Sequence, residues 1–211
     1  FDGYIKHFVW TDVIPTEEEI VNVNNTSAVI GRYETHKYHH KLYNYKNPNH
    51  KIIHYGMKDK RRDSDLKYYN RLIRDANDYK ENLFDNELWD NVKLSRSIIL
   101  PCFHEGFGYT AFEAGIFGVV PVVLTKDNDH ATTEYLTRAN VKHYSVDFND
   151  EIAIYKTIDE SLNVTTDDRK EISKKLLDYF SVMNYTNERI EILKSAKKKE
   201  NTETSLESFM E

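Results

Sequence analysis

The sequence has a single cysteine, Cys102, among its 211 residues, and this scarcity excludes a disulfide bond within the chain. One cysteine fits a reducing compartment, so we expect a cytoplasmic protein. The sequence also lacks an apolar run of transmembrane length, although peripheral membrane contact through another domain stays open. Basic residues are not in excess, because the net charge is −6 with both signs intermixed. We therefore expect no non-specific nucleic-acid-binding surface, which would normally be basic.

Internal repeats are also absent, and the length leaves room for one sizeable domain with its own core. We predict a linker or crossover segment over residues 1–25, a domain over residues 26–185, and a C-terminal helix with a disordered polar tail over residues 186–211. The 15 tyrosines, with abundant Asn and Lys, are typical of an AT-rich genome and compatible with a virus-encoded protein.

Residues 98–124 have the pattern of a strand, a tight loop, a short helix and a second strand. Ile98–Leu100 and Val119–Leu124 are apolar runs, and Tyr109–Phe117 between them can form a helix that ends at Gly118. Two buried strands joined through a helix form a βαβ unit with parallel strands and a right-handed crossover. The pattern predicts an α/β fold with a Rossmann-like, doubly wound, mostly parallel sheet.

The loop 102–108 lies where such sheets bind ligands, at the carboxyl ends of the strands. Gly106 and Gly108 remove side chains beside that ligand space. The amides of Gly108, Tyr109 and Thr110 would face outward from a helix N-terminus, an arrangement that attracts phosphate. We therefore predict a phosphate site at this loop.

Two carboxylates can reach the same crevice, Glu105 from the loop and Glu113 from one turn into the helix. An ionised glutamate accepts two hydrogen bonds, so the pair suits the recognition of hydroxyl groups. Cys102 could be a nucleophile, but no base–orienter pair is evident around it, and a small buried residue at a strand end is favoured.

The segment EGFGYTAFE, from Glu105 to Glu113, resembles the Glu–seven residues–Glu signature of retaining nucleotide-sugar glycosyltransferases of the GT-B fold. The surroundings look like that family too, with a strand ending at Pro101 and a P-V-V run at residues 121–123. The resemblance implies that Glu113 holds the ribose hydroxyls of the donor. It also implies that Glu105 binds donor-sugar hydroxyls and helps to position the anomeric centre.

The same resemblance assigns backbone amides to the donor. Gly106, Phe107 and Gly108 would contact the sugar, and Tyr109 and Thr110 the phosphate. Glu105 is not an obvious nucleophile, because retention in this family is explained by front-face attack with the leaving phosphate as the base. A missing side-chain base is therefore no defect.

A second resemblance follows the predicted strand Thr26–Gly31. Retaining GT-B enzymes often carry Gly-Arg here, with a Lys five residues beyond, as in Gly31, Arg32 and Lys37. The resemblance implies that Arg32 and Lys37 clamp the donor diphosphate, because fixed cations stabilise the charge that the leaving group gains. The alternative is a pair of ordinary surface cations. The chain departs from the family in having Tyr38 where a glycine usually follows the Lys.

We expect no metal site. His36, His39 and His40 lie at helical spacing but have no carboxylate or cysteine partner, so they predict a surface helix face. Asp127–Asp129 resembles the D-x-D metal motif of another glycosyltransferase fold, which the Rossmann-like context contradicts. Glu134 is the nearest match to a family glutamate that normally follows a Gly-Gly turn absent here.

Further strands are predicted at residues 51–56, 79–84 and 141–146, and further helices at residues 59–78, 86–95, 150–162 and 184–199. One more helix, capped by Thr165 or Thr166, ends at Tyr179. In the helix over residues 150–162 we expect four side chains to face the core: Ile152, Ile154, Ile158 and Leu162.

The resemblance covers about residues 26–185 and implies the donor-binding half of a GT-B glycosyltransferase. Its activity would be retaining transfer of a hexose, for example from UDP-glucose or GDP-mannose, to an unidentified glycan, lipid or other acceptor, with no cofactor besides the donor. We expect the acceptor domain to precede this chain. Two alternatives stay open: a non-catalytic nucleotide-sugar-binding module or partner subunit, and a phage-type DNA base glycosyltransferase, which differs in its acceptor.

Overall fold

The computed structural model describes residues 14–57, 63–76, 78–83, 85–102, 108–126 and 130–180. One compact unit spans Val13–Leu176, while Phe1–Asp12 and Leu177–Glu211 form a separate unit. The fold and the site belong to the larger unit. The predicted helix over residues 184–199 and the polar tail lie outside the described residues.

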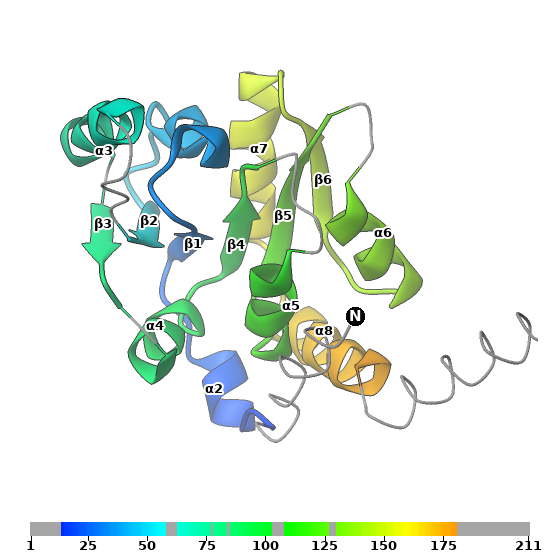
Figure 1. Ribbon diagram of the computed structural model, residues 1–211. Coiled ribbons are helices and arrows are strands. Elements are labelled where there is room, and N and C mark those ends of the chain that lie inside the picture. The colour runs from blue at the N-terminus through cyan, green and yellow to red at the C-terminus, as the bar shows by residue number, and fades with distance from the viewer. Residues whose placement is uncertain are drawn as a thin grey trace, which may run out of the picture. The chain divides into compact units, whose positions relative to one another are not determined.

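A six-stranded sheet forms the centre of the larger unit (Figure 1). Its strands are β1 (Thr26–Ile30), β2 (Lys51–Gly56), β3 (Asp78–Glu81), β4 (Ser97–Leu100), β5 (Val120–Thr125) and β6 (Tyr144–Asp147). They lie in the order β3-β2-β1-β4-β5-β6, and every neighbouring pair is parallel. This confirms the predicted α/β, doubly wound, parallel sheet. The strand order reverses between β1 and β4, and ligands bind at such switch points.

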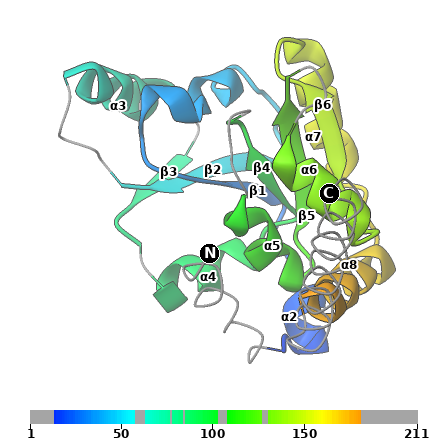
Figure 2. The same ribbon diagram turned by 45° about the vertical axis from the view of Figure 1, so that its right-hand side comes forward.

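Helices cover both faces of the sheet (Figures 1 and 2). They are α2 (Glu17–Val21), α3 (Asp63–Asp75), α4 (Asp85–Val92), α5 (Tyr109–Ile116), α6 (Ala131–Arg138), α7 (Glu151–Ser161) and α8 (Thr166–Tyr179), with two short 3₁₀ turns, η2 (Thr35–Lys37) and η3 (His39–Leu42). Figure 1 shows α5 in front of β4 and β5, and α7 behind them. The sheet is therefore buried between two helical layers, as a parallel sheet requires.

The main core lies between the sheet and the layer that contains α7 and η3. It comprises Val29, Leu42, Tyr45, Ile52, Ile99, Val122, Leu124, Val146, Phe148, Ile154 and Ile158. Ile99 of β4 faces Val122 of β5 in register, so neighbouring strands present matched rows of side chains to α7. Every residue of β4 and β5 is buried, which explains their nearly continuous apolar sequence.

The βαβ unit from β4 to β5 forms as predicted, including the helix end at Gly118 and the early strand position of Pro121. Gly118 has φ +71° and ends α5. Its N–H donates to the Gly115 carbonyl at 2.8 Å, and Val119 N–H donates to the Ala114 carbonyl at 3.2 Å, which is a Schellman motif. Pro121 pairs with β4, whereas pairing with β6 begins one residue later, so the missing N–H falls at an early strand position.

Two expectations about the last third of the chain are wrong in detail. The final strand begins at Tyr144 instead of Val141, whose buried N–H bonds to the Leu136 carbonyl at the end of α6. Ile152 is 82% exposed, although it was expected to face the core. Ile154 and Ile158 are four residues apart and share the buried face, so a residue two before Ile154 points to the opposite side.

Arg169 of α8 is 2% exposed and joins three parts of the chain at the amino ends of β4 and β5. Its Nε donates to the Ile20 carbonyl at 2.9 Å, and its Nη1 donates to the Ser95 and Arg96 carbonyls at 3.3 and 3.2 Å. Its Nη2 donates to the Phe117 carbonyl at 3.4 Å. These carbonyls lie at or just past the carboxyl ends of α2, α4 and α5, where helix dipoles favour positive charge. Burial lowers the pKa of Arg169 to about 10, so the guanidinium stays charged at neutral pH.

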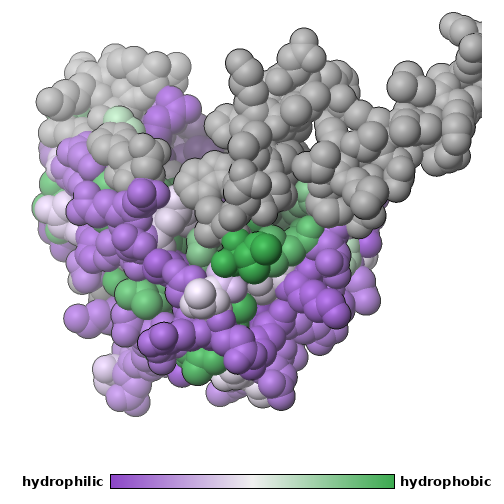
Figure 3. Space-filling model, turned by 90° about the horizontal axis from the view of Figure 1, so that it is seen from below, coloured by the Kyte–Doolittle hydropathy of each residue, from purple (hydrophilic) through white to green (hydrophobic). Residues whose placement is uncertain are grey.

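The amino ends of the strands carry some exposed apolar surface near α2. Figure 3 looks onto this end and shows apolar residues gathered on a mostly hydrophilic face. Ile14 and Val21, which precede and end α2, are 75% and 44% exposed, whereas Ile20 between them is buried. This short helix thus directs one side chain inward, and its turn also supplies the Ile20 carbonyl to Arg169.

Candidate functional site

The switch point between β1 and β4 brings two chain turns to the carboxyl ends of the strands. After β1, Gly31 N–H donates to the Tyr55 carbonyl at 3.0 Å, so the turn runs beside the end of β2. A Cβ on Gly56 would lie 2.0 Å from the Gly31 carbonyl oxygen, which makes glycine necessary at position 56. A Cβ on Gly31 itself would meet only ordinary contacts, the nearest 3.5 Å away at His39 Nε2. Packing therefore does not explain glycine at position 31.

The predicted cations Arg32 and Lys37 belong to the same turn. Arg32 Nη1 lies 3.1 Å from Glu34 Oε1, and the Arg32 side chain is 53% exposed. The other oxygen of Glu34 lies 3.0 Å from His36 Nε2. Lys37 ends η2, and its Cγ and Cδ would lie 3.8 Å from a Cβ on Gly31. The structure therefore gathers both cations around Gly31 and adds a buried carboxylate, Glu34, that sequence reasoning missed.

The expected surface helix face of His36, His39 and His40 is wrong. Tyr38 has φ 53° and ψ 25°, a left-handed conformation that separates η2 from η3 and prevents a continuous helix. This conformation favours glycine, and another residue type costs about 1 kcal/mol. In this chain the Tyr38 ring packs edge-on against Phe148, with centroids 4.8 Å apart.

His39 turns inward and pairs with a histidine of β2. Both His39 and His54 are 1% exposed, and their Nδ1 atoms lie 3.0 Å apart, so one ring donates and the other accepts. Burial lowers the pKa of His54 to about 3. Burial, and then the neighbouring His54, hold the pKa of His39 well below its ordinary value. The pair is therefore neutral and forms an uncharged support behind the Gly31–Lys37 turn.

Acid should destabilise the fold through this pair. An unfolded histidine titrates near pH 6.5, so between pH 6.5 and about 3 the unfolded chain binds protons that the folded chain excludes. We expect His54→Asn, which keeps a hydrogen-bonding amide but does not titrate, to reduce the loss of unfolding free energy between pH 8 and pH 5 by about 2 kcal/mol. Urea unfolding at both pH values measures this loss. Equal acid sensitivity in the two proteins would contradict a neutral His54.

The second turn at the switch point is the start of α5. Gly108 has φ +70°, and a Cβ there would lie 2.2 Å from Thr132 Oγ1 and 3.1 Å from Leu100 Cδ2. Glycine is therefore required by the turn and by packing against α6, and not by a ligand on that side of the residue. Tyr109 and Thr110 form the first turn of α5, whose amides lack intrahelical acceptors and point toward the carboxyl ends of the strands.

Glu113 lies one turn further along α5 and is half-buried. Among the described residues it has neither a hydrogen bond nor an ion pair. Burial alone raises the pKa of Glu113 to about 7. A carboxyl group that is withdrawn from water and left without a partner is unfavourable in the folded protein, and such groups concentrate at functional sites.

His130 fixes the start of the loop that begins at Cys102. It is the N-cap of α6 and is 5% exposed; its Nε2 donates to the Cys102 carbonyl at 3.0 Å, and its Nδ1 accepts from Thr132 N–H at 3.2 Å. Cys102 is buried, as expected for a small residue at a strand end. Glu134, by contrast, points to solvent on α6 and pairs with Arg138. No sequence signal identified His130 as this anchor.

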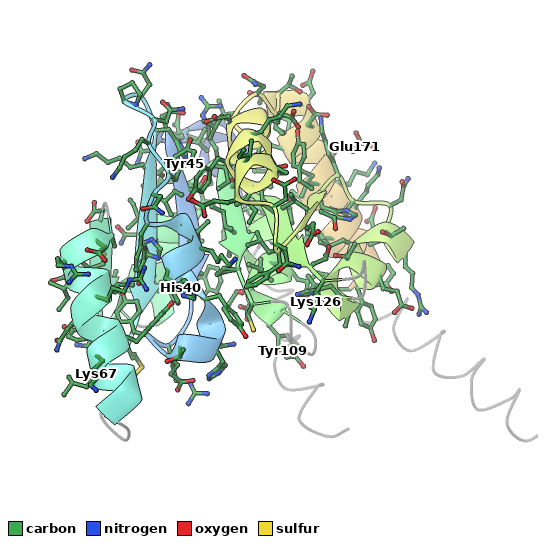
Figure 4. All side chains as sticks on the ribbon, turned by 90° about the horizontal axis from the view of Figure 1, so that it is seen from above. His40, Tyr45, Lys67, Tyr109, Lys126 and Glu171 are labelled. Carbon is green, nitrogen blue, oxygen red and sulfur yellow. The ribbon has the colours of Figure 1, made fainter. Side chains whose placement is uncertain are left out.

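Figure 4 looks down on the carboxyl ends of the strands and places these turns together. Tyr109 and Lys126 lie on the side of α5 and α6, and His40 lies on the side of α3. Glu105, Gly106 and Phe107 lie outside the described residues, as do residues 127–129. Within the described ranges there is no cluster of three or more residues that could hold a metal ion. The helices of those ranges are likewise too short or too polar to cross a membrane.

No family model matches the sequence, and a search of curated proteins finds no match either. Several solved structures are similar. A glycosyltransferase from Rickettsia africae has a TM-score of 0.64 and 15% identity, over 90% of this chain and 54% of that one. Sucrose-phosphate synthase from Thermosynechococcus elongatus has a TM-score of 0.62 and 14% identity, over 86% of this chain and 50% of that one. Trehalose-6-phosphate synthase OtsA has a TM-score of 0.62 and 16% identity, over 92% of this chain and 49% of that one.

These likenesses show the fold of the chain. It is the Rossmann-like α/β fold that forms one half of a GT-B glycosyltransferase. The chain spans about half the length of the solved proteins that it matches.

Proposed function

We propose that this chain is the donor-binding half of a glycosyltransferase and binds a nucleoside diphosphate sugar at the switch point between β1 and β4. The observation that carries the proposal is Glu113, a half-buried carboxyl group without a partner among the described residues. In the free protein this group is unsatisfied, and a ligand with two neighbouring hydroxyl groups would satisfy it. The ribose of a nucleotide carries such a pair.

The remaining parts of the site suit the rest of such a ligand. Arg32 and Lys37 would hold the diphosphate, Arg32 through several N–H groups and Lys37 as a point charge. The amides of Tyr109 and Thr110, at the N-terminus of α5, would meet the same charge. Among proteins of similar fold, trehalose-6-phosphate synthase of E. coli was solved with UDP-2-fluoro glucose and TarM of S. aureus with UDP.

The finer proposals rest on the resemblance noted in the sequence. Glu105, Gly106, Phe107 and Gly108 would bind the sugar, a hexose such as the glucose of UDP-glucose or the mannose of GDP-mannose. Transfer would retain the anomeric configuration, with the leaving phosphate taking the proton of the acceptor. The acceptor would be bound by a second domain, the half that this chain does not span.

A thermal-shift screen tests the donor site. We expect one of UDP, GDP and ADP, or its glucose or mannose conjugate, to raise the melting temperature, because a ligand that binds the folded state stabilises it by mass action. The nucleoside that gives the shift identifies the base. No shift with any of these compounds in the full chain would contradict the proposal.

Arg32→Ala should then weaken the binding of the diphosphate more than the binding of the nucleoside. We expect about tenfold to hundredfold weaker binding of the diphosphate, because a charge-assisted contact is lost, and little change for the nucleoside. Arg138→Ala is the matched control, since it removes an exposed arginine of α6 that pairs with a glutamate. Titration calorimetry measures both affinities. Equal losses for nucleoside and diphosphate would remove Arg32 from the phosphate site.

A further inference from the structure

Glu34 is an acidic residue in the middle of the proposed phosphate site, where a negative charge is not expected. It is 5% exposed, although its neighbour Arg32 reaches into solvent. One carboxylate oxygen lies 3.1 Å from Arg32 Nη1, and the other lies 3.0 Å from His36 Nε2. Both carboxylate oxygens of Glu34 therefore contact side chains of the same turn.

The backbone of Glu34 is fixed as firmly as its side chain. Its N–H donates to the Arg32 carbonyl at 2.8 Å, and its carbonyl accepts from Lys37 N–H at 3.0 Å. The first bond closes the turn after β1, and the second begins η2. Glu34 thus contacts Arg32 through its side chain and its backbone, and Lys37 through its backbone.

The contact restricts the rotamers of the Arg32 side chain. A mobile arginine side chain loses rotamer entropy when it binds an anion, and a side chain that is already held loses less. Glu34 contacts Nη1 of a planar guanidinium, whose fixed fork of N–H donors matches the geometry of phosphate oxygens. The buried carboxylate lies on the protein side of Arg32, because Glu34 is buried and Arg32 is half exposed.

We infer that Glu34 is a positioning residue, which presets the Arg32 guanidinium for the diphosphate of the donor. The inference rests on the proposed function, because it assumes that Arg32 meets a diphosphate. Glu34 does not touch the ligand and acts only through Arg32. His36 occupies the second carboxylate oxygen and keeps the carboxylate oriented toward the turn.

A double-mutant cycle in the full chain tests this. The proteins are wild type, Glu34→Gln, Arg32→Ala and the double variant, and the ligands are UDP, GDP and ADP, the matching nucleosides, and inorganic pyrophosphate. We expect Glu34→Gln to weaken the diphosphate and pyrophosphate about tenfold and to leave the nucleoside unchanged. In the Arg32→Ala background the same change should have no further effect, because the residue through which it acts is gone.

Two further variants serve as controls for this comparison. Glu34→Asp keeps the charge but is one methylene shorter, so it cannot reach both partners and should also weaken the diphosphate. Glu134→Gln removes the carboxylate of an exposed ion pair on α6 and should leave all affinities unchanged. Urea midpoints for every variant show which ones fold like the wild type, and Glu34→Asp replaces Glu34→Gln if the latter does not fold.

The outcomes separate the inference from the function on which it rests. The inference is overturned if Glu34→Gln binds the diphosphate like the wild type, if it weakens the nucleoside equally, or if its effect persists in the Arg32→Ala background. In each of these cases the wild type still binds a nucleoside diphosphate and the proposed function stands. If the wild type binds none of the three diphosphates, the proposed function fails and the inference fails with it.

Discussion

Arg169→Met should lower the free energy of unfolding by about 3–5 kcal/mol, the largest stability loss that we expect from a single substitution in this chain. Methionine fills much of the same volume but donates no hydrogen bond. The carbonyls of Ile20, Ser95 and Phe117 would each lose the guanidinium that donates to them. A buried acceptor without its donor costs about 1–3 kcal/mol, and several such groups would be affected at once.

Urea unfolding, followed by the fluorescence of Trp89 and Trp10, measures this loss. Lys174→Met is the matched control, because it makes the same kind of change at an exposed position of α8 and should alter stability by about 0.5 kcal/mol or less. Arg169→Lys should fall between the two, since an ammonium keeps the charge but cannot span all the carbonyls. A loss in Arg169→Met no greater than that in Lys174→Met would show that the guanidinium does not hold the three segments together.

Glu113→Gln should change stability and binding in opposite directions. We expect the variant to be more stable than the wild type by about 3 kcal/mol at pH 8 and to bind the nucleotide about tenfold to hundredfold more weakly. Glutamine has the same shape and stays neutral, so it avoids the unfavourable burial of a carboxylate. It also loses the ionised acceptor that the ribose hydroxyls would need.

The sign follows from the raised pKa of Glu113. Its folded value is about 7 and its ordinary value is 4.5, so the folded state holds a proton more tightly than the unfolded state. The contribution of Glu113 to stability is therefore greatest below pH 4.5 and declines as pH rises through 7. The gain from Glu113→Gln should appear across this window and vanish at pH 4, where both side chains are neutral.

Melting curves and nucleotide titrations at pH 4, 6 and 8 measure both effects. Glu171→Gln, on an exposed position of α8 paired with Lys175, is the control and should change neither quantity appreciably. A variant that loses stability and affinity together would make Glu113 an ordinary structural residue. Unchanged affinity would remove Glu113 from the site.

The fold was predictable where short-range patterns decide the structure. The mostly apolar segment that forms β2 ends at Gly56, and the predicted limits of the strand are those observed. The unit from β4 to β5 follows from two apolar runs and the left-handed glycine at position 118. The error at His39 has a single local cause, the left-handed backbone of Tyr38, which no side-chain pattern reveals.

The candidate site was predictable only in its motif residues. Arg32, Lys37 and Glu113 stand in local sequence patterns, so their roles could be proposed before the fold was known. Glu34 and His130 could not be found in this way, because a glutamate or a histidine in a loop has many uses. Their roles emerge when a neighbouring side chain or a carbonyl from another loop comes within 3.0–3.1 Å.

The hydrogen bonds of the Arg169 guanidinium have a consequence for how the sequence of this protein can evolve. Arg169 connects segments that precede β4 and β5, at the amino ends of the strands. The proposed ligand contacts follow β1 and β4, at the carboxyl ends of the strands. Substitutions in the turns that follow β1 and β4 therefore leave the hydrogen bonds of Arg169 intact. A lineage, or a laboratory selection, can therefore vary the binding turns for a new specificity without disturbing the contacts that Arg169 makes at the opposite ends of the strands.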